Sequence, residues 1–389
     1  MVLVVMMVIN QPAAPEKKPD FYRRRMLAAT AIGCLLPFIP GCGQQIRYKP
    51  EQKLRFLSAS TREEHFYSVS SFDSSGKVAF SIPTGMRLHS GVFHPLDSHI
   101  VVIFARRPGT QLLIVDANKG QVLSTIECPK DRHFYGHGCF SGDGSYLYTA
   151  ENDYEKGVGT IGIWDGKDYS RLGEMNSYGI GPHDVHLLSD SKTLVVANGG
   201  IRTHPDYQRR KLNLDSMQPA LVYIDAENGT LIQSIAIQNR SLSTRHLALT
   251  GDDKVLIAMQ YEGPKEDVVP LVGIQNGNSA IQMFQGPEDE LRRMRHYTAS
   301  ICFHPQSGVI GVTCPRGNIV TFWQVNTLTW VKTLEIADAG GIAMNQENSH
   351  FVITTGSGRV FLVNPVNFEQ RLLYVDKTLG WDNHLICSA

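Results

Sequence analysis

Four short apolar segments of the chain begin with a histidine that stands beside glycine or a second polar residue. The four pairs are Gly136-His137, His183-Asp184, Arg245-His246 and Asn383-His384. Imidazole and carboxylate groups ligate iron, copper and zinc, and histidine transfers protons near neutral pH, while arginine binds anions. The set predicts a site for a metal ion or an anion, with these candidate metal ligands: His137, His183, His246 and His384.

The segments that carry these histidines recur along the chain with a period of about 45 to 50 residues. Each copy has a polar start, an apolar strand, a turn and a second strand, as in Gly136 to Asp153. Other copies begin at Gly181, Ser243 and Tyr297, and fainter ones near Leu88 and Gly340. Repeats of this kind predict an all-β fold, a β-propeller in which each repeat forms one four-stranded blade.

The repeats favour seven blades over six. The six starts above and the stretch from Trp381 give seven innermost strands, but no further strands follow the last of them. Three candidate strands precede the first repeat, beginning at Lys53, His65 and Lys77. We therefore predict that these N-terminal strands pair with the C-terminal strand and close the ring, because closure leaves no exposed sheet edge.

The start of the first strand and the end of the second strand of a blade face the same mouth of the central channel. The residues that follow the second strands are also polar: Arg106, Arg107, Glu151, Asn152, Asp153, Asn198, Gln260, Tyr261 and Arg316. Together with the histidine pairs they predict a ligand-binding mouth rich in histidine and arginine. The alternative is a channel lined with polar residues only because it is wet.

A long insertion, residues 199–219, follows Asn198. Loops of this length in compact domains are usually functional or disordered. Because the insertion leaves the end of a second strand, we expect it to lie over the same mouth. Its charged residues could close over a bound anion or metal complex: Arg202, His204, Asp206, Arg209, Arg210 and Lys211. The alternative is a solvated, mobile loop.

Composition indicates a single propeller domain over residues 46–389. The chain has 389 residues, 42% of them hydrophobic, a formal net charge of zero and only 19% charged residues. Such a balance gives no basic surface for nucleic acid. The seven cysteines have no spacing typical of a zinc knuckle, a redox pair or a haem attachment site. We expect Cys139, Cys302 and Cys387 to be buried in innermost strands.

The first 45 residues have the features of an export signal. Arg23, Arg24 and Arg25 precede an apolar run, residues 26–39, which is too short to cross a membrane as a helix. Arg23-Arg24 resembles the twin-arginine motif, which predicts a periplasmic protein exported after folding. Ile39-Pro40-Gly41-Cys42 resembles a lipobox. Cys42 is thus a candidate lipid anchor and the one expected membrane attachment; a soluble mature form is the alternative.

Several stretches of the sequence resemble a bacterial family known as domain of unknown function 1513. They include GIGPHD from Gly179, VVANGG from Val195, the THPD of residues 203–206 and WDNHL from Trp381. The resemblance implies a propeller exported by the twin-arginine route. It also implies a role in metal acquisition, because family members are often encoded beside imelysin-like proteins and a di-haem oxidoreductase. These neighbours are the expected partners. The family supplies no established active site.

Three functions remain open from the sequence. The first is a binding propeller whose rim holds a metal ion, a metal complex or a partner protein. The second is a hydrolase or lyase with a histidine base near Glu151 or Asp184, although no nucleophile motif of the Gly-x-Ser-x-Gly kind is present. The third is an interaction scaffold without a small-molecule site.

Overall fold

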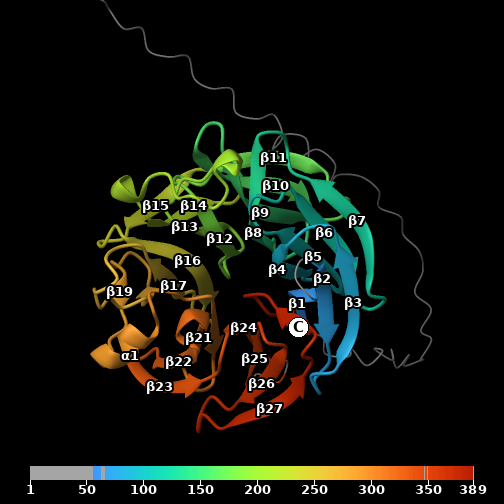
Figure 1. Ribbon diagram of the computed structural model, residues 1–389. Helices are drawn as coiled ribbons and strands as arrows, with labels where there is room; N and C mark the ends of the chain where they lie inside the picture. Colours follow the sequence, from blue (N-terminus) through green and yellow to red (C-terminus); the bar gives the residue numbers. More distant parts are fainter. Residues whose placement is uncertain (1–55, 63–65, 346, 348, 389) are drawn as a thin grey trace, which may run out of the picture. The chain divides into compact units, whose positions relative to one another are not determined.

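The computed structural model describes residues 56–62, 66–345, 347 and 349–388. These residues form seven antiparallel sheets arranged as blades around a central axis (Figure 1). The predicted seven-bladed β-propeller is confirmed. The predicted export residues Arg23 and Arg24 and the predicted lipid site Cys42 lie outside the described residues. Among the described helices, none is both long and apolar enough to span a membrane.

Six blades follow one another along the chain, and in each the first strand lies at one edge of the sheet, nearest the axis. Blade I has β4 (Leu88–His94), β5 (Asp97–Ala105), β6 (Gln111–Asp116) and β7 (Gln121–Glu127); blade II has β8 (Arg132–Phe140), β9 (Tyr146–Asp153), β10 (Val158–Asp165) and β11 (Arg171–Asn176). Blade III has β12 (Pro182–Leu187), β13 (Thr193–Asn198), β14 (Ala220–Asp225) and β15 (Leu231–Ala236); blade IV has β16 (Leu242–Leu249), β17 (Val255–Tyr261), β18 (Val272–Gln275) and β19 (Gln282–Met283). Blade V has β20 (Ser300–His304), β21 (Val309–Cys314), β22 (Ile319–Gln324) and β23 (Thr329–Glu335); blade VI has β24 (Ala339–Met344), β25 (Phe351–Thr355), β26 (Arg359–Val363) and β27 (Gln370–Val375).

The seventh sheet, the closing blade, joins the two ends of the described chain. Its strands are β1 (Phe56–Arg62), β2 (Phe66–Phe72), β3 (Val78–Thr84), β28 (Leu379–Trp381) and β29 (Ile386–Cys387). β28 and β29 both pair with β1, so the predicted closure by N-terminal and C-terminal strands is confirmed. In Figure 1 the red C-terminal segment accordingly lies beside the blue β1. β29 also contacts β24 and β4, which completes the ring of innermost strands.

Short side-chain hydrogen bonds define the turns between the outer strands. Asp116 accepts hydrogen bonds from the backbone N–H groups of Asn118 and Lys119, and Asp225 does the same for Glu227 and Asn228. Aspartate favours such turns because its carboxylate can satisfy N–H groups that the strands leave unpaired. The same device recurs at Asp165 in blade II and Asn364 in blade VI.

The hydrophobic core lies between neighbouring sheets. One cluster joins Phe104 of blade I to Phe134 and Trp164 of blade II, and another joins Ile161 of blade II to Val196 of blade III. Each blade therefore buries its faces against its neighbours, which is why the sequence repeat extends around the ring.

Within the described residues, helices are few and lie in the connections. Residues 199–219 separate β13 from β14, as predicted, and contain the 3-10 helices η2 (Pro205–Tyr207) and η3 (Leu214–Ser216). A third 3-10 helix, η4 (Pro315–Gly317), follows β21, and the short helix α1 (Glu288–Arg293) follows β19.

Candidate metal centre

Five histidines meet where the innermost strands face one another. They are His89 of β4, His137 of β8, His183 of β12, His246 of β16 and His384 between β28 and β29. Their ring centroids lie 4.4 to 6.4 Å apart in the nine pairs that are in contact. Each histidine comes from a different blade, so only the closed ring brings all five together.

Irregularities in strand pairing place four of these side chains. In β12 the pairing shifts between Pro182 and Asp184, so that His183 is the extra residue of a bulge. Shifts also occur in β4 after Leu88, in β8 after Phe134 and in β16 after Thr244. A bulge redirects a side chain and increases the local twist, and bulges are common beside functional sites. The sequence indicated that β8 starts near Gly136; it starts at Arg132 instead, and its bulge contains His137.

The fifth histidine lies in a break within the last innermost strand. The sequence indicated one continuous strand from Trp381, but the structure has β28 and β29 with residues 382–385 between them. Two glycines of β24 allow this segment to approach. A Cβ on Gly340 would lie 3.1 Å from the carbonyl oxygen of Asp382, and one on Gly341 would lie 2.8 Å from the backbone nitrogen of Leu385.

Two buried aspartates support the histidines from outside the cluster. Nδ1 of His89 lies 3.5 Å from Asp382, and Nδ1 of His137 lies 3.4 Å from Asp184. Asp184 also accepts a hydrogen bond from the backbone N–H of Leu247. A carboxylate behind one ring nitrogen is the usual outer partner of a metal-ligating histidine, because it orients the ring and leaves the other nitrogen free.

Several ring nitrogens of the cluster are suited to bind a metal ion. Nε2 of His137 and Nδ1 of His183 and His246 are buried without a hydrogen-bond partner among the described residues. Nε2 of His89 and Nε2 of His384 lie 3.2 Å apart. Zn–N bonds of about 2.0–2.1 Å place neighbouring ligand nitrogens roughly 3 Å apart, so this spacing suits two ligands of one ion.

Two overlapping sets of three histidines have ligand atoms within 4.8 Å of one another. One set is His89, His137 and His183, and the other is His137, His246 and His384. His137 belongs to both sets and is the central residue of the cluster. Imidazole ligands suit zinc, copper, iron and nickel, whereas calcium and magnesium prefer oxygen. The described residues thus form a candidate centre for a transition metal.

Burial keeps the imidazoles neutral. It lowers the pKa of His89 and of His137 to about 3, against the partly opposing effects of Asp382 and Asp184. Burial and the neighbouring histidines lower the pKa of His183, His246 and His384 well below the usual value. A neutral imidazole is the form that donates a lone pair to a metal.

A pocket of about 210 Å³ opens onto this cluster. His89, His183 and His246 form part of its wall, together with Arg245, Arg316 and Asn383 from the sequence-predicted set. Arg209 and Lys211 of the insertion line the same pocket, so this part of the insertion lies over the histidines as expected. We call this space the vestibule.

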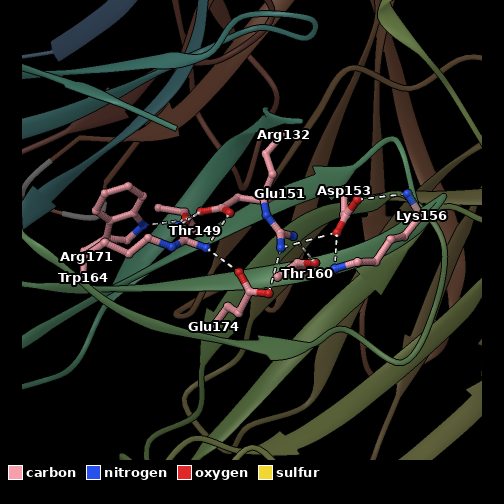
Figure 2. Close-up of polar contacts among 9 residues, drawn as sticks. All are labelled: Arg132, Thr149, Glu151, Asp153, Lys156, Thr160, Trp164, Arg171 and Glu174. Atoms are coloured by element: carbon pink, nitrogen blue, oxygen red, sulfur yellow. Dashed lines mark hydrogen bonds and ion pairs between the residues drawn. The ribbon is translucent and has the colours of Figure 1, made fainter. Parts of the chain in front are cut away.

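Other sequence-predicted residues lie elsewhere. Glu151 and Asp153 belong to a network of ion pairs within blade II, which includes Arg132, Arg171 and Glu174 (Figure 2). The side chain of Asn152 donates one hydrogen bond to the Thr203 carbonyl and lies 2.9 Å from Nε2 of His133. Asn198 is fully buried and bonded to Ser177.

The remaining predicted residues do not line the vestibule. Arg202 and Asp206 are exposed in the insertion, and His204 contacts Tyr154 and Tyr207. Tyr261 belongs to a neighbouring pocket, which it shares with Arg316 and His296. The structure therefore brings together the histidines and part of the arginines, but not the acidic residues at the end of β9.

Sequence reasoning missed His89 and Asp382. The sequence predicts a strand start near Leu88, but His89 is not among the predicted ligands. The letters LHSG at Leu88 resemble GHGC at Gly136 closely enough to have suggested His89. Asp382 directly precedes the predicted pair Asn383-His384, and nothing in the sequence places it behind His89.

Comparison with known proteins gives a family and a fold. The family described as a protein of unknown function, DUF1513, matches residues 82–388. The chain belongs to this family. No curated protein matches the sequence. Among solved structures, hydrazine synthase of Kuenenia stuttgartiensis is similar with a TM-score of 0.58 and 14% identity, over 80% of this chain and 92% of that chain. At this identity the similarity concerns the propeller fold alone.

Proposed function

We propose that this protein is a metal-binding propeller that holds a transition-metal ion among the five histidines of its channel. The observation that carries the proposal is a set of buried ring nitrogens, in His137, His183 and His246, that have no hydrogen-bond partner within the described part of the chain. A buried polar atom without a hydrogen bond costs about 1–3 kcal/mol. A metal ion would use several of these atoms at once and so remove the cost.

We further propose that the protein acts in the cell envelope, in the acquisition of iron or another metal. The support is the twin-arginine-like pair Arg23-Arg24 and the export by this route that the resemblance to the family implies. Fractionation of cells tests this part. The chain should occur in the periplasmic fraction, and Arg23→Lys combined with Arg24→Lys should retain it in the cytoplasm. Detection of the unaltered chain in the cytoplasm would contradict export.

The hydrolase or lyase alternative loses one of its proposed groups. Glu151 is fully buried, and its carboxylate accepts hydrogen bonds from Thr149 and from both terminal nitrogens of Arg171. A carboxylate held in this way is not placed to assist a histidine base in the channel.

Elemental analysis of the purified full chain tests the metal site. We expect roughly one iron, copper or zinc ion per chain after exposure to each metal and removal of excess. His137→Ala should reduce the bound metal at least about tenfold, because His137 belongs to both ligand sets. His99→Ala is the matched control, since His99 is exposed on β5 of blade I.

The two variants separate the functions that remain open. Loss of metal in His137→Ala with retention in His99→Ala supports the proposal. Equal metal content in both variants, or no metal in the unaltered chain, would contradict it and favour a scaffold. The unfolding temperature of each variant shows whether the ring is intact.

A further inference from the structure

The wall of the vestibule is strongly cationic. Six of its side chains carry positive charge: Arg106, Arg107, Arg209, Lys211, Arg245 and Arg316. No aspartate or glutamate of the described chain lines the pocket with them. The overall net charge of the chain is zero, so this concentration of charge is a local feature.

Nearby carboxylates neutralise only part of this charge. Asp382, behind the histidines, forms ion pairs with Arg87 at 2.7 Å and with Arg106 at 3.3 Å. Glu262 forms an ion pair with Lys211 and lies 3.9 Å from Arg245. Among the described residues, no ion pair engages the other three cations of the wall: Arg107, Arg209 and Arg316.

Arg245 points to a ligand most directly. Its side chain is only 10% exposed, and its Nε has no hydrogen-bond partner among the described residues. The guanidinium carries a positive charge at neutral pH. A buried charge without a close partner is unfavourable, and an anion in the vestibule would supply that partner.

The neighbouring histidine cluster increases the need for an anion. Neutral imidazoles bring no negative charge to a metal ion, and the ion would lie beside the six cations of the vestibule wall. Asp184 and Asp382 compensate this charge only from behind the rings. An anion between the guanidinium groups and the ion would be attracted by both.

Size and hydrogen-bonding groups limit the class of anion. The pocket volume of about 210 Å³ is below the range of about 300–1,000 Å³ of sites for drug-sized ligands. Arginine forks match carboxylate and phosphate groups, and several such groups in one ligand would use several arginines. Tyr135, Gln260, Tyr297 and Asn383 also line the pocket and can bond the remaining oxygens.

The insertion makes the pocket a built feature of the fold. The side chain of Asn213 donates to the Gly200 carbonyl at 2.9 Å and accepts from the backbone N–H of Arg202 at 2.6 Å. Thr203 lies 3.3 Å from the hydroxyl of Tyr135, a residue of the pocket wall. The Asn213 contacts join the two ends of the insertion to each other, and the Tyr135 contact joins the insertion to blade II.

We propose that the vestibule binds a small anion with two or more carboxylate or phosphate groups, and that this anion contacts a metal ion held by the histidines. The second half of the statement rests on the proposed function, while the first half stands on the pocket alone. Citrate represents the carboxylates and pyrophosphate the phosphates. Acetate, with one charge, is the reference ligand.

Calorimetric titration of the full chain tests the anion site first in the absence of metal. At about 0.15 M salt, where exposed charges are screened within about 8 Å, citrate or pyrophosphate should bind at least about tenfold more tightly than acetate. The tighter of the two identifies the chemical class. The double variant Arg209→Gln, Arg316→Gln should weaken that binding at least about tenfold. Both residues are exposed, so their replacement leaves the core intact.

Arg240→Gln is the matched control, because Arg240 is an exposed arginine outside the vestibule. It should leave the affinity unchanged. Arg245→Met tests the anion site a second time, at a buried position. Its unfolding temperature shows whether the variant is folded. The proposal is overturned if citrate and pyrophosphate bind no better than acetate, or if the double variant binds them as the unaltered chain does.

A further titration separates this proposal from the proposed function. His137→Ala should still bind the anion in the absence of metal, because His137 does not line the pocket. In the unaltered chain, loading with metal should increase the anion affinity, and the anion should increase the metal affinity by the same factor. Anion binding without any metal binding would contradict the proposed metal centre but not the anion site. Metal binding without an effect on the anion would contradict the contact between them.

Discussion

Gly136 determines how closely two of the candidate ligands approach. Its backbone φ is +100°, a conformation that L side chains rarely adopt. A Cβ at this position would lie 2.5 Å from Cδ2 of His89. The bulge of β8 and the ring of His89 therefore both depend on the absence of a side chain.

We expect Gly136→Ala to displace the ring of His89 and to reduce metal affinity at least about tenfold, with a stability loss of about 1–3 kcal/mol from backbone strain. Metal titration and urea denaturation measure the two effects. Gly173→Ala is the control, since a Cβ there meets no atom within 4 Å. Unchanged metal affinity in Gly136→Ala would mean that His89 is not required.

At the scale of single residues, the sequence predicted that histidines gather in the channel. It did not predict the bulges and the aspartate that surround them. Four of the five histidines were recognised because they stand at the same place in each repeat. The bulges could not be predicted, because they depend on the exact register of two paired strands. The place of Asp382 could not be predicted either, because His89 lies in a distant part of the chain. Position within the repeat was not sufficient for Glu151. It stands at the predicted place, but it forms an ion pair with Arg171.

Blade II is held together by polar contacts as well as by its core. Figure 2 shows Arg171 of β11 reaching Glu151 of β9, with Nη1 2.8 Å and Nη2 3.0 Å from the carboxylate oxygens. Trp164 of β10 donates to Thr149, which in turn donates to Glu151. A Cβ on Gly162 would lie only 1.9 Å from the Glu151 carboxylate, so this glycine provides the space that the network occupies.

Glu151→Gln should lower the free energy of unfolding by about 2–4 kcal/mol, because removing one partner of a buried ion pair leaves the other charge uncompensated. Urea denaturation checks this value. Glu227→Gln, at an exposed turn, should change the stability by less than about 0.5 kcal/mol. Metal content should remain normal in both variants, and its loss in Glu151→Gln would indicate that the network does support the channel.

Strands and turns were the most predictable elements. Alternating apolar residues and clusters of Gly, Asp and Asn marked them, because those residues satisfy the backbone in tight turns. The boundaries of β8 and the division of the last strand into β28 and β29 were not predictable. Both involve backbone that leaves the regular ladder in order to place a histidine.

At the scale of the whole molecule, the closing blade joins distant parts of the chain. Trp381 pairs with Ser60 of β1 and is 4% exposed. Its ring packs edge-on against Phe72 of β2 at 5.1 Å between centroids, and Phe72 stacks on Phe56 at 5.0 Å. These contacts close the ring in place of a covalent bond.

Trp381→Ala should lower the free energy of unfolding by about 3–5 kcal/mol, since it removes a large buried ring from the seam. It should also reduce metal binding, because His384 lies on the same segment. Leu372→Ala, at a position 49% exposed on β27, is the control for denaturation and metal titration. A stable variant with normal metal content would contradict the role of the seam.

The number of blades and the way they close could be predicted from the sequence alone. The repeat indicates how many innermost strands there are. The three candidate strands before Leu88 supply the strands that the last repeat, from Trp381, lacks. The arrangement of the five histidines could not be derived in the same way. It depends on how far each blade turns and on which residue each bulge directs inward.

The order of the histidines along the chain has a consequence for synthesis. A nascent chain that has emerged as far as blade VI carries His89, His137, His183 and His246, but β28, β29 and His384 have not yet been made. The ring cannot close on the ribosome before that point. All five candidate ligands can therefore come together only after the last blade is complete, in whichever compartment that occurs.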